Sequence, residues 1–377
     1  MRICVVYDCL HPWTVGGEER WLRLLAETAA ARGHQVTYLT RQQWDTPPDV
    51  PGVAVVAVSG RDDLYGPDGN RRIGPTLRFA AGVTRHLARN RGHYDVVHTC
   101  GFPYFHLLGA RAVTRVPLVV DWPEVWSAAY WRAYLGPVRG TVGALVQRLC
   151  LWATPVPLVF SERHGRLVPR GRRVGGLAPD PSPHVPLPAA NPPRVVFAGR
   201  HIREKRPDLV VRAVAEARRR PGLQDLRATV FGEGPERPAV EQLVRELGLT
   251  GVVDVPGFVD EAVLDAALAT AVCLVHPSSR EGFGIVVLEA AARGVPVVLV
   301  DGPANAAVEL VSSDNGFLAL ESTADAVADA IEKACTAGEA LRASSSRWYG
   351  ERADSLSAAR TVDRVLAVYD DLLLPVP

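Results

Sequence analysis

The chain has 377 residues, which is enough for two domains of ordinary size. Its 42 basic and 41 acidic side chains give a formal net charge of +1, and 47% of its residues are hydrophobic. This composition excludes an acidic disordered chain, and the balanced charge argues against a protein that binds nucleic acid in bulk. Only two of the basic residues are lysines, Lys205 and Lys333.

The first half of the chain alternates between strand and helix patterns. Strands are expected at residues 3–7, 35–40, 53–58, 95–98 and 117–120, with helical patterns between several of them. In the first of these helices, which follows the loop 11–17, apolar residues recur at the 3.6-residue spacing of an amphipathic helix. Alternation of this kind is typical of a parallel, doubly wound α/β sheet.

A proline-rich segment divides the chain. Seven prolines fall within residues 178–193, too many for a helix or a central strand. The alternation then resumes, with strands expected at 194–198, 228–232, 252–255, 272–276 and 295–300, and helices at 207–219 and 235–247. We therefore predict a first domain over 1–177, a stiff linker over 178–193, a second domain over 194–355 and a final helix over 356–377. A cleft at the carboxyl ends of the strands is the expected active site.

The segment 276–290, HPSSREGFGIVVLEA, carries the sharpest functional signal. It predicts the end of a strand, a glycine-bracketed turn and a helix that begins near Gly284, whose free N–H groups can bind an anion. Glu281 lies in the turn, and Glu289 lies about five residues into the helix. Such a pair of carboxylates can accept hydrogen bonds from the vicinal hydroxyls of a sugar.

With FGEGPER (231–237), VPGFV (255–259) and AAARGVPVV (290–298), this segment resembles the E-x7-E signature of retaining GT-B glycosyltransferases of family 4. The resemblance covers nearly all of the second half of the chain. It implies two Rossmann-like domains that face each other across a cleft, the first binding the acceptor and the second a nucleotide-diphosphate sugar. The enzyme would transfer the sugar to a hydroxyl- or amine-bearing acceptor with retention of anomeric configuration.

The resemblance also assigns donor-binding roles. Glu281 would contact the hydroxyls of the donor sugar, and Glu289 would hold the ribose hydroxyls. Backbone groups would be offered to the sugar, the diphosphate or the base by Gly16, Gly17, Gly257, Val259, Gly282, Phe283 and Gly284.

Two cations complete the expected catalytic set. Arg200 and Lys205 match the family pattern G-R-x4-K and would bind the diphosphate, whose negative charge grows as the glycosidic bond breaks. The resemblance therefore implies an enzyme without a metal ion or other cofactor. The same pattern taken alone would fit two solvated basic residues in a charged loop.

The first half departs from the family pattern. Relatives often carry a histidine after the strand expected at 117–120, whereas this chain has Pro123 near that place. We name four acceptor-contacting candidates, for each of which a purely structural role stays open: His98, Asp121, Glu124 and Trp126. Four of the eight tryptophans cluster within 122–152. Core packing of helices accounts for such a cluster as well as function does, and two functional roles compete, an acceptor platform and a membrane-facing surface.

Other features narrow the class without deciding the pathway. The six cysteines lack metal-ligand spacing. No export signal or membrane-spanning run is evident, so a cytoplasmic protein is expected, with peripheral contact at the inner face of the membrane left open.

A nucleotide-sugar 2-epimerase and a non-catalytic sugar-nucleotide-binding paralogue are the alternative functions. A dehydrogenase is disfavoured because G-x-G-x-x-G is missing. The donor base, the acceptor, natural-product or cell-envelope biosynthesis, and the oligomeric state stay open.

Overall fold

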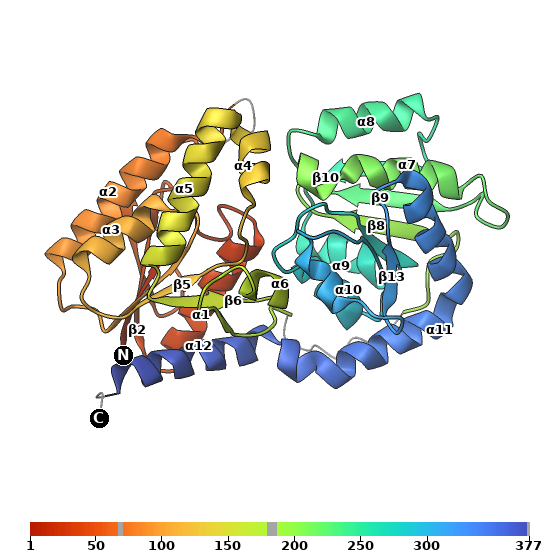
Figure 1. The fold of residues 1–377 in the computed structure, drawn as a ribbon. Helices are drawn as coiled ribbons and strands as arrows, with labels where there is room; N and C mark the ends of the chain where they lie inside the picture. The colour runs from red at the N-terminus through yellow and green to blue at the C-terminus, as the bar shows by residue number, and fades with distance from the viewer. Residues whose placement is uncertain (67–70, 179–186, 375–377) are drawn as a thin grey trace. The chain divides into compact units, whose positions relative to one another are not determined.

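The computed structural model describes residues 1–66, 71–178 and 187–374, and the chain divides into two compact units (Figure 1). Unit 1 comprises Met1–Gly176 and Ala358–Pro377, and unit 2 comprises Leu177–Ser357. The C-terminal helix thus belongs to the same unit as the N-terminus. Half of the predicted linker, 179–186, lies outside the described residues, and 187–193 belong to unit 2.

Unit 1 is built on a seven-stranded parallel sheet in the order β3-β2-β1-β4-β5-β6-β7. Its central strands are buried along almost their whole length, as expected for apolar strands covered on both faces. The strands are β1 (Arg2–Val6), β2 (Gln35–Arg41), β3 (Val53–Ser59), β4 (Val96–Cys100), β5 (Leu118–Asp121), β6 (Val156–Val159) and β7 (Arg172–Arg173).

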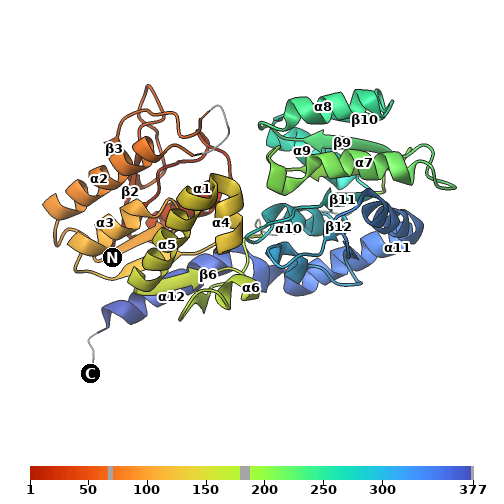
Figure 2. The same cartoon turned by 45° about the horizontal axis from the view of Figure 1, so that its top comes forward.

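Helices cover both faces of this sheet. The helices are α1 (Gly17–Ala31), α2 (Ile73–Arg89), α3 (Phe105–Val113), α4 (Ala128–Leu135), α5 (Pro137–Ala153), α6 (Glu162–Gly165) and α12 (Ala358–Leu373). Helices α2, α3 and α5 lie over one face, while α12 packs beside α1 on the other (Figures 1 and 2). An ion pair between Arg32 and Asp363 joins α12 to the end of α1 at 2.5 Å.

Unit 2 has a six-stranded parallel sheet in the order β10-β9-β8-β11-β12-β13. Its elements are β8 (Arg194–Ala198), η1 (Arg203–Lys205), α7 (Pro207–Ala217), β9 (Arg227–Phe231), α8 (Arg237–Glu246), β10 (Val253–Gly257), α9 (Glu261–Ala269), β11 (Cys273–His276), α10 (Ile285–Ala292), β12 (Val297–Val300), η2 (Ala306–Leu310), β13 (Gly316–Ala319) and α11 (Ala324–Leu356). Helix α11 kinks at Gly338, which has a φ of +49°.

The predicted fold class is confirmed, since both units are parallel α/β sheets with alternating helices. Three strands lie outside the predicted set: β6, β7 and β13. Strand β6 contains Pro157, which pairs in register with Val120 of β5. Proline has no N–H to donate to a ladder, so its presence made the apolar run 156–159 a poor candidate for a strand.

Helix α2 packs so closely on strand β3 that Gly82 has no room for a side chain. A Cβ atom at this position would lie 2.0 Å from the backbone oxygen of Val58. We expect Gly82→Ala to lower the free energy of unfolding by about 1–3 kcal/mol, because the clash with backbone outweighs the higher helix propensity of alanine. Urea unfolding measures the change. Gly74→Ala on the same helix is the control, since its Cβ would make an ordinary 3.5 Å contact with Arg78; equal stability of the two variants would contradict the expectation.

Candidate active site

Two loops of unit 2 bring two of the three predicted catalytic residues, Lys205 and Glu281, into contact. Strands β8 and β11 are neighbours in the sheet, at the point where the strand order reverses. The chain leaves β8 towards Lys205 and leaves β11 towards Glu281. Such a switch point at the carboxyl edge of a parallel sheet is where doubly wound folds bind ligands.

Lys205, Glu281 and His276 form one contact group. The ammonium of Lys205 donates to Oε2 of Glu281, and Nε2 of His276 lies 2.7 Å from the same oxygen. The side chains of Lys205 and Glu281 keep 19% and 13% of their surface exposed, whereas His276 is buried. Lys205 and Glu281 therefore keep surface that a ligand can reach, whereas His276 does not.

The charge state of this group follows from its surroundings. Burial of the Glu281 carboxyl opposes its ionisation, but the attraction of Lys205 and the hydrogen bond from His276 outweigh it and hold its pKa well below the usual range. Burial lowers the pKa of His276, although Glu281 acts in the opposite direction. We assign a carboxylate at Glu281, with a neutral imidazole at His276 that donates through Nε2.

Backbone contacts hold both loops in place. The N–H of Ser279 donates to the carbonyl of Glu204 at 2.8 Å, which ties the turn that carries Glu281 to the turn that carries Lys205. The buried amide of Asn305 donates to the carbonyls of Ser278 and Val300 at 3.1 and 2.9 Å. The carboxylate is thus fixed by a rigid turn, as a binding group requires.

The turn 281–284 leads directly into α10. Gly282, Phe283 and Gly284 are buried, and Gly284 is the residue immediately before the helix. Its φ of +92° favours glycine, and a Cβ there would lie 2.6 Å from the Cβ of Ala307. Glu289 lies half-buried on α10, one helical turn further along.

Arg200 lies in the loop between β8 and η1, with an exposed side chain. His201 beside it is completely buried, and neither of its ring nitrogens has a hydrogen-bond partner among the described residues. Burial lowers the pKa of His201. Glycines approach this loop closely, because a Cβ at Gly232 would lie 1.9 Å from the carbonyl oxygen of Gly199. His201 is not among the residues predicted from the sequence, because it lies inside the G-R-x4-K segment without a motif of its own.

The loop after β10 holds the other predicted donor-binding residues of unit 2. Gly257 has a φ of +85°, and a Cβ there would lie 2.4 Å from a carboxylate oxygen of Glu233. Glu233 is ion-paired with Arg237. Val259 is half-buried, and Phe258 between them is exposed. The N–H of Gly232 also donates to the carbonyl of Gly257 at 2.8 Å. The FGEGPER segment therefore contacts the backbone of this loop at Gly257.

In unit 1, two of the acceptor candidates lie in the core. His98 and Asp121 have no exposed surface, and Nε2 of His98 lies 2.9 Å from Oδ2 of Asp121. The same oxygen accepts from Nε1 of Trp21 at 2.8 Å, and Nδ1 of His98 contacts the hydroxyl of Tyr369 on α12. The structure thus gives both side chains a packing role that joins α1 and α12 to the sheet, instead of a place on an acceptor surface.

Glu18 is a neighbouring carboxyl that the sequence analysis left out of the candidate site. Burial raises its pKa, and repulsion by Asp121 raises it further, so Glu18 retains its proton well above the usual range. It lies in the first turn of α1, after Gly16 and Gly17. The backbone of Gly16 is extended, with a φ of −169°, and an added Cβ would meet only the flexible end of Glu19. The fold itself therefore does not demand glycine at position 16.

Glu124 and Trp126 remain partly accessible. Nε1 of Trp126 donates to a carboxylate oxygen of Glu124 at 3.0 Å, and the backbone N–H of Trp126 donates to Gln147 at 2.9 Å. The ring of Trp126 packs against the ring of the buried Trp131, with 4.6 Å between the two ring centroids. The predicted tryptophan cluster is thus divided between core packing, a partly exposed ring at 126 and the exposed Trp152.

Acid is expected to destabilise unit 1 through His106. Its ring is completely buried, with Nε2 at 2.7 Å from the hydroxyl of Thr99, and burial lowers its pKa from 6.5 to about 4. Between pH 6.5 and about 4, His106 binds a proton in the unfolded chain but not in the folded chain. The free energy of unfolding should therefore fall by about 3 kcal/mol as the pH drops through this range. Urea unfolding at several pH values measures it. His106→Gln should reduce the slope and His93→Gln, at an exposed position, should not; identical slopes would contradict the assignment.

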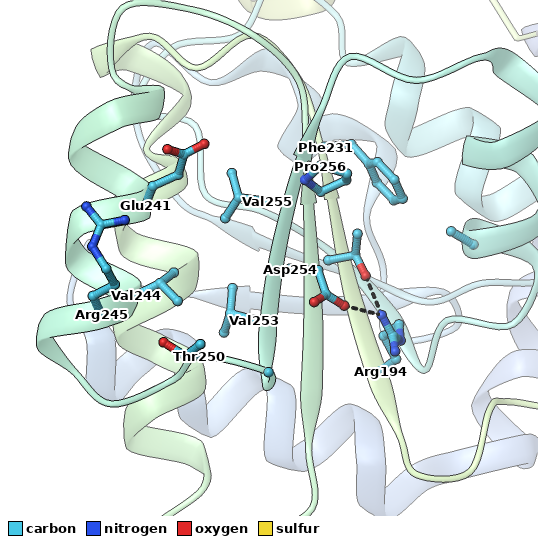
Figure 3. Close-up of a pocket in the computed structure, with 13 residues that line it drawn as sticks. Arg194, Phe231, Glu241, Val244, Arg245, Thr250, Val253, Asp254, Val255 and Pro256 are labelled. Atoms are coloured by element: carbon cyan, nitrogen blue, oxygen red, sulfur yellow. Dashed lines mark hydrogen bonds and ion pairs between the residues drawn. The ribbon is translucent and has the colours of Figure 1, made fainter.

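Figure 3 shows a pocket of about 880 Å³ at the edge strand β10 of unit 2. Nη1 of Arg194 contacts Thr229 at 2.6 Å and Asp254 at 3.1 Å in its wall. None of its thirteen lining residues is a predicted site residue.

In the described part of the chain, no group of three or more His, Cys, Asp or Glu side chains could hold a metal ion. None of the helices there is long and apolar enough to cross a membrane.

Solved structures with the same architecture define the class. Sucrose-phosphate synthase from Thermosynechococcus elongatus matches with a TM-score of 0.80 and 21% identity over 98% of both chains. HepE of Anabaena, solved with UDP-glucose, matches with a TM-score of 0.71 and 16% identity over 98% of this chain and 100% of its own. At these identities the likeness concerns the fold, which is the GT-B fold of two Rossmann-like domains.

Sequence relatives then define the family. The model described as Glycosyl transferases group 1 matches residues 183–348, and the model described as Glycosyltransferase Family 4 matches residues 15–156. The D-inositol 3-phosphate glycosyltransferase of Actinosynnema mirum is 30% identical over 94% of this chain and 92% of its own length. The chain therefore belongs to the group 1 glycosyltransferases, with a family 4 region in its N-terminal half.

Proposed function

We propose that this glycosyltransferase moves a sugar from a nucleotide-diphosphate sugar to a hydroxyl- or amine-bearing acceptor with retention of configuration and without a metal ion. The observation that carries the proposal is the contact group of Lys205, Glu281 and His276 at the switch point of unit 2. The presence of UDP-glucose in the HepE structure supports a sugar nucleotide as the donor.

Glu281 supplies the group that recognises the sugar. Its carboxylate stays ionised, and a carboxylate accepts up to about four hydrogen bonds. Lys205 and His276 occupy Oε2. Oε1 is then the oxygen we assign to the hydroxyls of the donor sugar, and the backbone of Gly282–Gly284, which follows directly in the chain, is assigned to the sugar and the diphosphate.

Lys205 supplies the charge that stabilises the leaving group. An ammonium has three N–H donors, of which one points to Glu281, so two are free to turn towards phosphate oxygens. Arg200, exposed in the same loop, can add a bidentate contact. Both cations act on the diphosphate, where negative charge develops as the bond to the anomeric carbon breaks.

Retention then follows from attack on the face that the diphosphate leaves. The acceptor oxygen or nitrogen forms its bond to the anomeric carbon while the bond from that carbon to the phosphate oxygen breaks. The departing phosphate oxygen takes the proton of the acceptor, so no protein nucleophile and no metal ion is consumed or required. We assign acceptor contacts in unit 1 to Glu124 and Trp126, which keep exposed surface. Gly16 and Gly17 stay predicted backbone contacts of the donor, and the fold does not itself require glycine at position 16.

A donor panel tests this function. The enzyme is mixed with UDP-, GDP-, ADP- and dTDP-sugars, and binding and slow hydrolysis are measured for each. We expect one base to be preferred and its sugar to be released slowly without added acceptor. NMR of an acceptor product should show the anomeric configuration of the donor. An inverted product would contradict retention, and failure of every donor to bind would contradict the whole assignment.

A further inference from the structure

Helix α5 of unit 1 carries a row of apolar side chains on its outer side. All five members are exposed, two of them by more than three quarters: Val138 (76%), Val142 (56%), Leu145 (58%), Leu149 (49%) and Trp152 (80%). They follow one another at steps of four and three residues, which places them on one side of the helix over about 21 Å. Single exposed apolar residues are common, but a continuous row indicates an interaction surface. We call this row the α5 stripe.

The opposite side of α5 fixes the orientation of the helix. Gly140, Ala144, Gln147 and Cys150 are buried there. A Cβ at Gly140 would lie 2.2 Å from the backbone oxygen of Trp131, so the helix is packed as closely as backbone allows. The amide of Gln147 bonds to both the N–H and the carbonyl of Trp126. The α5 stripe therefore cannot turn inwards to join the core.

Charge is segregated around the stripe. The four helices α2, α3, α4 and α5 contain no aspartate or glutamate, although they contain seven arginines: Arg78, Arg85, Arg89, Arg111, Arg132, Arg139 and Arg148. All seven are exposed, and Arg78 pairs with Asp62 in the loop before α2. The near-neutral balance of the whole chain thus conceals four helices whose only charged side chains are basic, apart from histidine. On α5, the helical spacing places Arg139 and Arg148 on either side of the stripe.

This combination favours a lipid surface over a second copy of the chain. In a two-fold pairing of α5 helices, each helix would bring Arg139 and Arg148 to the margins of the contact, and α5 offers no acid to compensate their charge. A bilayer with anionic headgroups instead accepts the apolar row below its surface and attracts the arginines. Trp152, at the end of the row, is the side chain type that prefers the headgroup level.

We propose that the α5 stripe and its flanking arginines dock unit 1 onto an anionic phospholipid bilayer. The helix lies in the plane of the interface, with the stripe below the headgroups and Arg139 and Arg148 among the phosphates. The contact is peripheral, and it is independent of the donor chemistry in unit 2. An enzyme held in this way works at the membrane surface.

Vesicle binding by the full chain tests the proposal. Co-sedimentation is compared between vesicles of phosphatidylcholine alone and vesicles with about a third phosphatidylglycerol. We expect binding to the anionic vesicles only, weakened by salt. The double variant Leu145→Ser, Trp152→Ser should weaken it about tenfold or more, and Arg139→Gln, Arg148→Gln should weaken it and flatten the salt dependence. Leu320→Gln, at an equally exposed position of unit 2, is the matched control and should bind as the unchanged protein does.

Three outcomes would overturn the proposal. The first is no binding of the unchanged chain to anionic vesicles, and the second is equal binding by the stripe variant. The third is a dimer in light scattering that the stripe variant converts to a monomer, which would assign the surface to a second copy. Donor hydrolysis and thermal unfolding of each variant report whether its fold is intact, so that a loss of vesicle binding is attributed to the surface.

Discussion

Glu281→Gln is expected to lower kcat at least about 100-fold while the protein stays folded. Glutamine keeps the shape of the side chain and one acceptor oxygen, but it removes the negative charge that holds Lys205 and accepts from His276. The loss should be similar throughout the pH range above about 5, because the pKa of Glu281 lies well below its usual value and the carboxylate is already ionised there. Initial rates with the preferred donor, together with thermal unfolding, measure both parts of this result.

Glu321→Gln provides the matched control for this loss. Glu321 is an exposed glutamate of the same unit, outside the contact group, so its replacement should leave turnover unchanged. Full turnover by Glu281→Gln would remove Glu281 from the site. A variant that unfolds at much lower temperature would instead show that the carboxylate is needed chiefly for stability.

Lys205→Ala is expected to have an effect of similar size by a different route. Loss of the ammonium removes a charge from the departing diphosphate, so kcat should fall by about 100- to 1,000-fold. Lys205→Arg keeps the charge but replaces a compact ammonium by a larger planar group, so it should recover only part of the rate. Rapid-mixing kinetics with the donor separates the loss in kcat from any loss in donor affinity.

A second readout distinguishes catalysis from a structural role of Lys205. Without the ammonium, the pKa of Glu281 should rise, because the attraction that counters its burial is removed. As the pH is lowered, the residual activity of Lys205→Ala should then begin to decline at a higher pH than the activity of the unchanged enzyme does. Arg203→Ala, an exposed position of the same 3-10 turn, is the control and should keep the full rate and pH profile. An unchanged rate for Lys205→Ala would contradict the assignment.

The fold was predictable to a large extent because it rests on local patterns. Runs of β-branched residues that alternate with segments of helical, 3.6-residue spacing predicted two parallel α/β domains, which the structure confirms. Strand β6 was missed because Pro157 weakens the local strand signal, while its place beside β5 is decided by burial in the sheet. Short elements of this kind depend on neighbours that are distant in sequence.

The candidate site was predictable in part. The turn around Glu281 could be named from its residue types, and the role of Lys205 followed from the resemblance of its loop to the family pattern G-R-x4-K. Each stays a prediction until its variant is measured. Their contact joins residues 76 positions apart, and only the adjacency of β8 and β11 brings them together. His276 could be placed at the end of its strand, but its hydrogen bond to Glu281 depends on the conformation of the turn between them.

His98 shows the same division most clearly. The sequence alone determined that a histidine ends a buried strand; it favoured a structural role for that ring and left acceptor binding as the alternative. The tertiary structure decided for packing, because α12 returns to unit 1 and brings the hydroxyl of Tyr369, 271 residues away, to Nδ1 of His98. The sequence likewise determined that the residues of α5 are mostly apolar, with two arginines and no acid. Which of its side chains are exposed was decided by the close packing of Gly140, because a helix has several faces and only its neighbours select the one that is buried.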